Sequence, residues 1–274
     1  MATHVPAMPA GGIRQAIGDG LIVTWRNLKR VPRIPELAVL AIIQSIMFVL
    51  LFAFVFGGAI PLPDGGSYRE FLMPGIFAQT VVFASVTTAI GMTDDLSKGL
   101  IDRFRSLPMA RSAVLSGRAL FDLIYNAVIL VVLMLSGLAV GWRVHGSVEE
   151  FFAGVGLLLL FTFAMSWVGV AMGLYVRTVE SANQVGFTLI FPLTFVSNVF
   201  VPPQTLPGWL QPVAEWNPVS ALTAAVRGLW GNPNPYSTTG FPAEHPVLMT
   251  VLWVAVLIAV FAPIGVRRYR LMSR

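Results

Sequence analysis

Six long apolar runs constrain the fold of this chain more than any other feature of its sequence. They lie near Leu37–Gly57, Phe71–Ile90, Ala119–Val140, Phe151–Gly173, Gln184–Val201 and Val247–Val266. An α-helix needs about 20 apolar residues to cross the hydrocarbon core of a bilayer, so each run has roughly the spanning length. Helices satisfy their own backbone hydrogen bonds, which lipid cannot do for them. The sequence therefore predicts an all-α polytopic membrane protein with six transmembrane helices.

Composition supports this class of protein. Hydrophobic residues make up 56% of the 274 residues and charged residues only 11%, whereas a soluble domain carries about 25% charge. The chain has no cysteine, which excludes disulfides, thiolate chemistry and cysteine–zinc sites. We expect no metal site and no catalytic site in this chain.

The positions of the basic residues predict an orientation. With the N-terminus inside, 15 of the 18 Lys and Arg residues fall in cytoplasmic segments, and only Arg69, Arg143 and Arg227 fall elsewhere. An excess of Lys and Arg in cytoplasmic loops is the usual signal of membrane orientation. The sequence thus predicts a multi-pass protein of the cell (plasma or inner) membrane with cytoplasmic N- and C-termini. The basic charge is then an orientation signal, and we expect no nucleic-acid partner.

Residues 1–33 are expected to form a cytoplasmic N-terminus ahead of a membrane domain over residues 34–274. Apolar residues recur at helical spacing through residues 12–31, at Ile13, Ile17, Leu21, Leu28 and Val31, with polar residues between them. This pattern predicts an amphipathic helix on the cytoplasmic leaflet, with Trp25 at the interface. The alternative is a disordered basic arm.

A second amphipathic segment lies in the long loop between the second and third runs, residues 92–120. Asp94 and Asp95 carry the charge that favours a helix N-terminus, and Pro108 is expected to end the helix. One face has Leu96, Leu100, Phe104 and Leu107, and the other has Asp95, Lys98, Asp102, Arg103 and Arg105. A helix this short is marginal alone in water. We expect it either to lie on lipid or to dock on a partner.

Residues 201–235 separate the last two apolar runs and fit neither a span nor an ordinary loop. Prolines at 202, 203, 207 and 212 break any continuous helix. Trp209 and Trp216 suit the headgroup level of a bilayer. Asn217 is expected to be an N-cap and Pro218 the first residue of a helix. Arg227 is the lone cation on the apolar stripe of that helix.

Two stretches carry a resemblance to a known family, KGLIDRFRSLPMARSAVLSGR and FVSNVFVPPQTLPGWLQPVAEWNPVSALTAAVRGL. Together they resemble ABC exporter permeases of the second exporter class, in the daunorubicin-resistance permease branch. The resemblance implies that the loop carries a coupling helix which docks on a separate ATPase subunit. The implied coupling residues are Asp95, Leu96, Lys98, Gly99, Leu100, Asp102, Arg103, Phe104, Arg105 and Leu107. One departure is Leu100, because many members of the class have threonine there.

The resemblance also gives residues 201–235 a form, an extracellular re-entrant helical hairpin. Its implied residues are Pro202, Pro203, Trp209, Trp216, Asn217, Pro218 and Arg227. The backbone of such a hairpin is tolerated at membrane depth only where protein or a wet cavity covers it. A hairpin that caps the outer mouth of a translocation path meets that condition.

The function expected from this resemblance is that of the membrane-spanning permease subunit of an ATP-driven exporter. Neither Lys29 nor Lys98 lies in a phosphate-binding loop, so ATP and Mg are expected in a separate ATPase. Six spans suggest half a transporter, paired with a second copy of itself or a related permease and working by alternating access. The alternative is an ion-coupled secondary transporter of hydrophobic compounds, which would want carboxylates near the bilayer midplane. An intramembrane enzyme is disfavoured because the chain offers no paired titratable groups within its spans.

The substrate expected from the resemblance is an amphipathic drug, natural product or lipid-like molecule. Two stripes of phenylalanine could line its path, together with three polar residues inside the spans. These residues are Phe48, Phe52, Phe56, Phe187, Phe191, Phe195, Gln44, Gln79 and Asn198. The alternative for the stripes is helix packing or lipid contact, and for the polar residues hydrogen bonding between helices.

Overall fold

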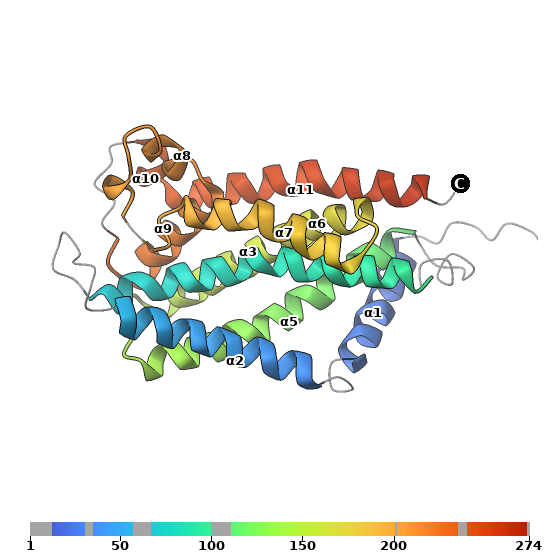
Figure 1. Cartoon of the computed structure of the whole chain (residues 1–274), viewed down its shortest axis with the longest axis horizontal. Coiled ribbons are helices and arrows are strands. Elements are labelled where there is room, and N and C mark those ends of the chain that lie inside the picture. Colours follow the sequence, from blue (N-terminus) through green and yellow to red (C-terminus); the bar gives the residue numbers. More distant parts are fainter. Residues whose placement is uncertain are drawn as a thin grey trace, which may run out of the picture.

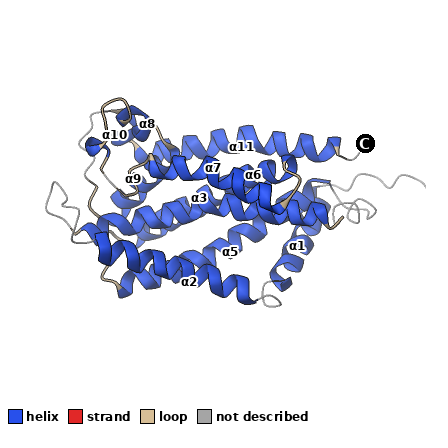
Figure 2. Cartoon of the chain, in the orientation of Figure 1, coloured by secondary structure: helices blue, strands red, loops and turns tan. Residues whose placement is uncertain are grey.

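The computed structural model describes residues 13–30, 35–56, 67–99, 111–200, 202–234 and 240–272. Within these ranges every regular element is a helix, as Figure 2 shows. In chain order they are α1 (Ile13–Arg30), α2 (Pro35–Leu51), the π-helical η2 (Phe52–Phe56), α3 (Tyr68–Ser97), α5 (Arg111–Ala139), α6 (Val148–Tyr175), α7 (Val179–Phe195), the 3₁₀ turn η3 (Pro203–Thr205), α8 (Gln211–Glu215), α9 (Pro218–Trp230), α10 (Phe241–Glu244) and α11 (Pro246–Leu271). The predicted all-α class is confirmed.

The bundle has two distinct ends along its long axis. Figure 1 places α1 and the C-terminal end of α11 at one end, and α8, α9 and α10 at the other. We call these the α1 end and the α9 end. The helices α2, α3, α5, α6, α7 and α11 run along the bundle between them. These helices therefore connect the two ends within the described part of the chain.

Helix α3 lies at the centre of the bundle and packs against α5, α6, α7 and α9. Its closest contact is with α6, where two glycines four residues apart let the backbones approach. A Cβ on Gly169 would lie 2.3 Å from Ser85 O, and one on Gly173 would lie 2.7 Å from Ala89 O. These glycines serve packing within the chain. Gly141, by contrast, lies beyond the end of α5 with φ +102° and serves the turn there.

Among the described residues, four helices are long and apolar enough to cross a membrane, namely α3, α5, α6 and α11. They correspond to four of the six predicted runs. The fifth run is misplaced at both ends, since α7 begins at Val179 and ends at Phe195. Its predicted end at Val201 is wrong because the carbonyls of Leu193 and Val196 accept hydrogen bonds from Asn217 Nδ2, and residues 196–200 form bends and turns. The first run corresponds to α2 and η2.

Helix α1 confirms the helix predicted for residues 12–31. Its inner face packs on α5, where Thr24 Oγ1 donates a hydrogen bond to Gly117 O at 2.9 Å. Its outer face leaves Leu21, Ile22 and Trp25 more than half exposed. The Lys29 Nζ atom lies 5.2 Å from the centre of the Trp25 ring. An apolar face with a flanking cation is the arrangement that suits a membrane surface.

Candidate functional site

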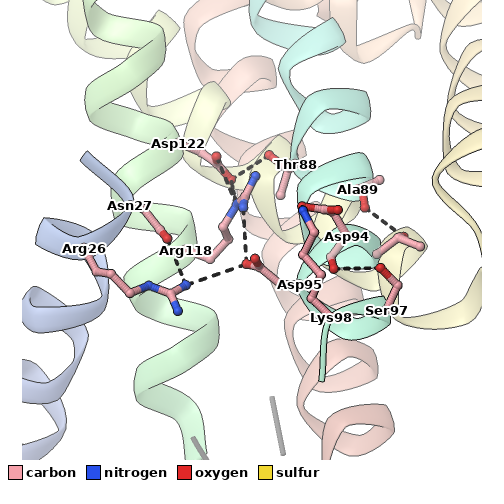
Figure 3. Close-up of polar contacts among 11 residues, drawn as sticks. Arg26, Asn27, Thr88, Ala89, Asp94, Asp95, Ser97, Lys98, Arg118 and Asp122 are labelled. Carbon is pink, nitrogen blue, oxygen red and sulfur yellow. Dashed lines mark hydrogen bonds and ion pairs between the residues drawn. The ribbon is translucent and has the colours of Figure 1, made fainter. Parts of the chain in front are cut away.

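A buried cluster of charges joins three helices at the α1 end (Figure 3). Arg118 of α5 lies between two carboxylates, with Nε 3.3 Å from Asp122 Oδ1 and Nη1 3.7 Å from Asp95 Oδ2. Thr88 Oγ1 of α3 donates a hydrogen bond to Asp122 Oδ2 at 2.7 Å. All three charged residues are less than 10% exposed. Charges this buried persist only when they are paired and hydrogen-bonded.

The cluster depends on space left by a glycine and extends to α1. A Cβ on Gly91 would lie 2.0 Å from Arg118 Nη2, so a larger residue there would displace the guanidinium from its present position. From α1, Arg26 Nη2 lies 3.9 Å from Asp95 Oδ2 and donates a hydrogen bond to Asn27 Oδ1 at 3.0 Å. The cluster thus fastens α1, α3 and α5 together immediately beside the loop that connects α3 and α5.

The predicted coupling residues are only partly described. Asp95 and Leu96 lie in the last turn of α3, Lys98 is its C-cap, and Gly99 follows with φ +63°. The expectation that Asp94 and Asp95 begin a new helix is wrong. Helix α3 continues past them because α6 and α5 hold it, through the Thr93–Gly173 hydrogen bond at 3.1 Å and the ion pairs of Asp95.

The last turn of α3 holds two of the predicted coupling residues, and both face inward. Asp95 was expected on the outward polar face of the loop helix, but its side chain is buried beside Arg118. Leu96 packs against the apolar cluster that contains Met92, Leu115 and Tyr269. Six predicted coupling residues lie outside the described residues, namely Leu100, Asp102, Arg103, Phe104, Arg105 and Leu107.

At the α9 end, a buried arginine holds the turn after α7. Arg227 of α9 is 0% exposed and donates hydrogen bonds to three backbone carbonyls, of Phe71 at 2.8 Å, Asn198 at 2.9 Å and Val199 at 3.1 Å. Its guanidinium carbon lies 3.6 Å from the centre of the Phe71 ring. Arginine suits this position because its planar fork reaches several acceptors at once. The residue expected as a lone cation on an apolar stripe is thus a structural centre.

The same turn is tied to α9 by side-chain amides. Asn217 caps α9 through its Oδ1 atom, which accepts a hydrogen bond from Val219 N at 2.8 Å, so the predicted N-cap is confirmed. Its Nδ2 atom donates to Leu193 O and Val196 O at 2.7 and 2.6 Å. Asn198 donates through its backbone N–H to Ser220 Oγ at 3.0 Å and through Nδ2 to Ser220 O. Asn198 therefore hydrogen-bonds between segments in this structure and does not face an open path.

The remaining residues of the predicted hairpin lie in a segment of short helices. Pro203 is the first residue of η3 and Pro202 precedes it, and both are buried. Pro218 is the first residue of α9, as predicted. Trp209 is 76% exposed and Trp216 is 54% exposed. Exposed tryptophans at one end of an apolar bundle are typical of the membrane–water interface.

The two predicted phenylalanine stripes meet through a residue that the sequence reasoning missed. Ring centroids lie 4.7 Å apart for Phe48 and Phe52 of the α2–η2 helix, and 4.1 Å apart for Phe191 and Phe195 of α7. Phe200 lies between the stripes, 4.7 Å from Phe52 and 5.0 Å from Phe195. We call these five rings the aromatic line. The sequence shows only the four-residue spacing of phenylalanines on two separate helices. The link between the helices is not visible there, because a turn makes it.

The other predicted path residues lie in varied surroundings. The rings of Phe187 and Phe83 are 5.5 Å apart, so Phe187 contacts α3 and does not belong to the aromatic line. Gln44 is exposed on α2, and Gln79 is buried in α3. The side chain of Phe56 lies outside the described residues.

A second missed feature closes the α9 end between α5, α6 and α9. The indoles of Trp142 and Trp230 are 5.2 Å apart, and Phe77 contacts both. Trp142 Nε1 donates a hydrogen bond to Asn232 Oδ1 at 3.0 Å, and Trp230 Nε1 donates to Phe151 O at 3.2 Å. Buried indoles with satisfied N–H groups make a rigid packing centre. Spacing along the chain gives no sign of it, because Trp142 and Asn232 are 90 residues apart.

The fold thus defines a helical, multi-pass membrane protein, and comparison with known proteins gives its family. The ABC-2 type transporter family model matches residues 20–230. The chain belongs to that family. The match includes α3, α5, α6, α7 and α9, with both the charge cluster and the Arg227 site.

Individual relatives cover nearly the whole chain. The daunorubicin resistance ABC transporter permease protein DrrB1 of Streptomyces coeruleorubidus is 32% identical over 255 residues, which are 93% of this chain and 87% of that protein. The probable doxorubicin resistance ABC transporter permease protein DrrC of Mycobacterium tuberculosis strain H37Rv is 27% identical over 261 residues, 93% of this chain and 90% of its own length. The putative transport permease ycf38 of Cyanophora paradoxa is 24% identical over 79% of this chain. This chain is accordingly a permease, the non-catalytic membrane component of an ABC transporter.

Proposed function

We propose that this permease exports a flat, amphipathic drug or natural product, using ATP hydrolysed by a separate ABC ATPase subunit. The observation that carries the proposal is the similarity to drug-resistance permeases over 93% of the chain. The aromatic line adds a physical reason, because stacked phenylalanine rings suit a flat apolar ligand. ATP and Mg would bind in the partner, and this chain would bind the drug.

The structure supports a membrane domain with six crossings. At 1.5 Å per residue, the 17 residues of α7 are about 26 Å long, slightly less than the roughly 30 Å hydrocarbon core. Residues 196–200 extend this crossing, and their backbone groups are hydrogen-bonded to Asn217, Ser220 and Arg227. Covered backbone of this kind is what a membrane tolerates outside a helix. We propose that the α2–η2 helix and α7 complete the six spans, with η3, α8 and α9 as a re-entrant hairpin.

The α1 end is proposed to face the cytoplasm. The three basic residues outside the predicted cytoplasmic segments, Arg69, Arg143 and Arg227, all contact groups at the α9 end. The amphipathic α1 and the basic C-terminal end of α11 lie together at the opposite end (Figure 1). This separation of charge follows the positive-inside rule.

Coupling to the ATPase is proposed to pass through residues 100–110, between α3 and α5. The charge cluster flanks this loop, with Asp95 before it and Arg118 after it. A movement of this loop, imposed by the ATPase, would therefore displace α1, α3 and α5 together. Two permeases, identical or related, would then alternate between inward and outward access. We expect Phe104→Ala to leave insertion intact and to reduce co-purification of the ATPase, while Val128→Ala on the exposed face of α5 reduces neither.

The experiment that tests the proposal measures daunorubicin accumulation in inside-out membrane vesicles that contain the permease and its ATPase. We expect accumulation that requires hydrolysable ATP and persists when ionophores dissipate the proton and sodium gradients. Accumulation driven by an imposed ion gradient without ATP would instead identify an ion-coupled transporter. Vesicles with an ATPase that lacks its phosphate-loop lysine provide the matched control.

A further inference from the structure

Phe200 occupies a position that links two helices which otherwise present separate aromatic stripes. Its ring is 8% exposed and lies between Phe52 and Phe195. By contrast, Phe191 and Phe195 of α7 are 47% and 42% exposed. The aromatic line thus runs from partly open rings on α7 to a covered contact between Phe200 and Phe52. The covered contact lies at the α9 end, next to the turn that Arg227 holds.

Hydrogen bonds fasten the backbone around Phe200 to α3 and α9. Its carbonyl accepts a hydrogen bond from Tyr68 Oη at 3.1 Å, and the carbonyls of Asn198 and Val199 accept from Arg227. The turn also presses on α3, because a Cβ on Gly75 would lie 2.7 Å from Val199 O. These contacts fix Phe200 to α3 and α9. The rings of Phe52 and Phe200 stack, and an aromatic pair is weaker than several charge-assisted hydrogen bonds.

The helix on the other side of the contact is irregular at the contacting residue. The α-helical part of α2 ends at Leu51, and the π-helical segment begins at Phe52. π-helical segments are rare, bend their helix and occur often at functional positions. Helix α2 can therefore change direction where Phe52 meets Phe200, while the turn that carries Phe200 stays in place.

We propose that Phe200 closes the outer end of the drug path by stacking on Phe52, and that a flat substrate takes the place of the Phe52 ring as it leaves. This inference rests on the proposed export function and adds its closing residue. In the closed state the ring of Phe52 covers Phe200. When the outer part of α2 moves away, Phe200 presents an aromatic face to the drug. Phe200 is then both the closing residue and a residue that favours flat substrates.

The test fastens the contact with a covalent link, and the cysteine-free chain contributes no other thiol. The chain without introduced cysteines, treated with the same reagent, shows any effect of the reagent on other proteins. Phe52→Cys/Phe200→Cys is treated in vesicles, without nucleotide, with a short reducible bifunctional thiol reagent. We expect an intramolecular cross-link that abolishes ATP-dependent daunorubicin accumulation, and recovery of accumulation after reduction. The matched control, Glu70→Cys/His145→Cys, links α3 to the segment before α6 at the same end of the bundle, where the two side chains lie 3.0 Å apart, and is expected to keep accumulation when cross-linked.

Several outcomes would overturn the inference while leaving the export function intact. One is full accumulation by the cross-linked Phe52–Phe200 pair, and another is failure of the link to form. If the reduced double variant exports nothing, Phe200→Leu decides, because leucine is apolar but has no stacking face. We expect its KM for daunorubicin to rise about two- to twelvefold, the fold-change that corresponds to the loss of an aromatic pair. A lower maximal rate that follows protein abundance, with KM unchanged, shows a packing role only. Absence of ATP-dependent accumulation in the wild type would instead refute the export function itself.

Discussion

Two ion pairs on neighbouring helices allow the contribution of the buried charge cluster to be measured. Arg118 pairs with Asp122, and Lys98 pairs with Asp94, each with a spacing of four residues. The first pair is buried and the second is largely exposed. Breaking a buried pair by removing one partner costs about 3–5 kcal/mol, whereas an exposed pair contributes about 0–1 kcal/mol. Thr88 still donates to Asp122 after the arginine is lost, so we expect a cost near the lower value, about 3 kcal/mol.

The perturbation is Arg118→Met, which keeps much of the side-chain length and removes the charge. A domain of this size loses about 2 °C in Tm for each kcal/mol, so we expect a decrease of about 6 °C. Lys98→Met is the control and is expected to change Tm by less than about 2 °C. Both are measured by tryptophan fluorescence during heating in detergent. Equal Tm values for the two variants would refute the claim that the buried cluster holds the α1 end together.

Three further predictions concern packing, orientation and the α9 end. Gly169→Leu should separate α3 from α6 and lower the yield of monodisperse protein. Gly156→Leu on the same helix is the control, because a Cβ there meets nothing within 4 Å, and equal yields of the two variants would contradict the contact. Positions 67 and 97 lie at opposite ends of α3, so an impermeant thiol reagent should label Ser67→Cys in intact cells and spare Ser97→Cys. The reverse labelling pattern would show that the protein has the opposite orientation in the membrane. Arg227→Met leaves three buried carbonyls without this donor, at a cost in stability of at least about 3 kcal/mol. It should therefore lower Tm by about 6 °C or more, and an unchanged Tm would show that Arg227 does not hold the α9 end together.

The sequence predicted the long helices well because length and apolarity are local properties of the chain. The helices α3, α5, α6 and α11 coincide with predicted runs, and α1 with the predicted amphipathic segment. The cap of α9 was also predictable, since Asn217 followed by Pro218 is a local signal. Errors occurred where a distant contact decides the outcome. Helix α3 continues through Asp94 and Asp95 because Thr93 and Asp95 bind partners on α6 and α5.

The candidate site was predictable only in part, for the same reason. The two phenylalanine stripes follow from helical spacing, but their link through Phe200 depends on how a turn folds back. Arg227 was identified as unusual, yet its acceptors are carbonyls up to 156 residues away, and no side-chain pattern encodes them. Arg118 and Asp122 could have been noticed, since a basic and an acidic residue four apart at the start of an apolar run are costly in lipid unless paired.

Burial explains why α3 is the spanning helix that carries Thr88, Thr93 and Asp95, and α3 also connects the two ends of the bundle. Of the four spanning helices described, α3 is the least apolar and the most buried. Helix α11 is the most apolar, and only 17% of its apolar stretch is buried within the chain. A helix that faces lipid has to be apolar, but one surrounded by protein can hold Thr88, Thr93 and Asp95 because neighbouring helices satisfy them. With 30 residues, α3 is about 45 Å long. It is fastened to α5 at the α1 end through Asp95 and to α9 at the other end through the Phe71 carbonyl. Helix α3 is thus held at both ends, and in the export mechanism that we propose it is the fixed reference against which the stacked rings of Phe52 and Phe200 part.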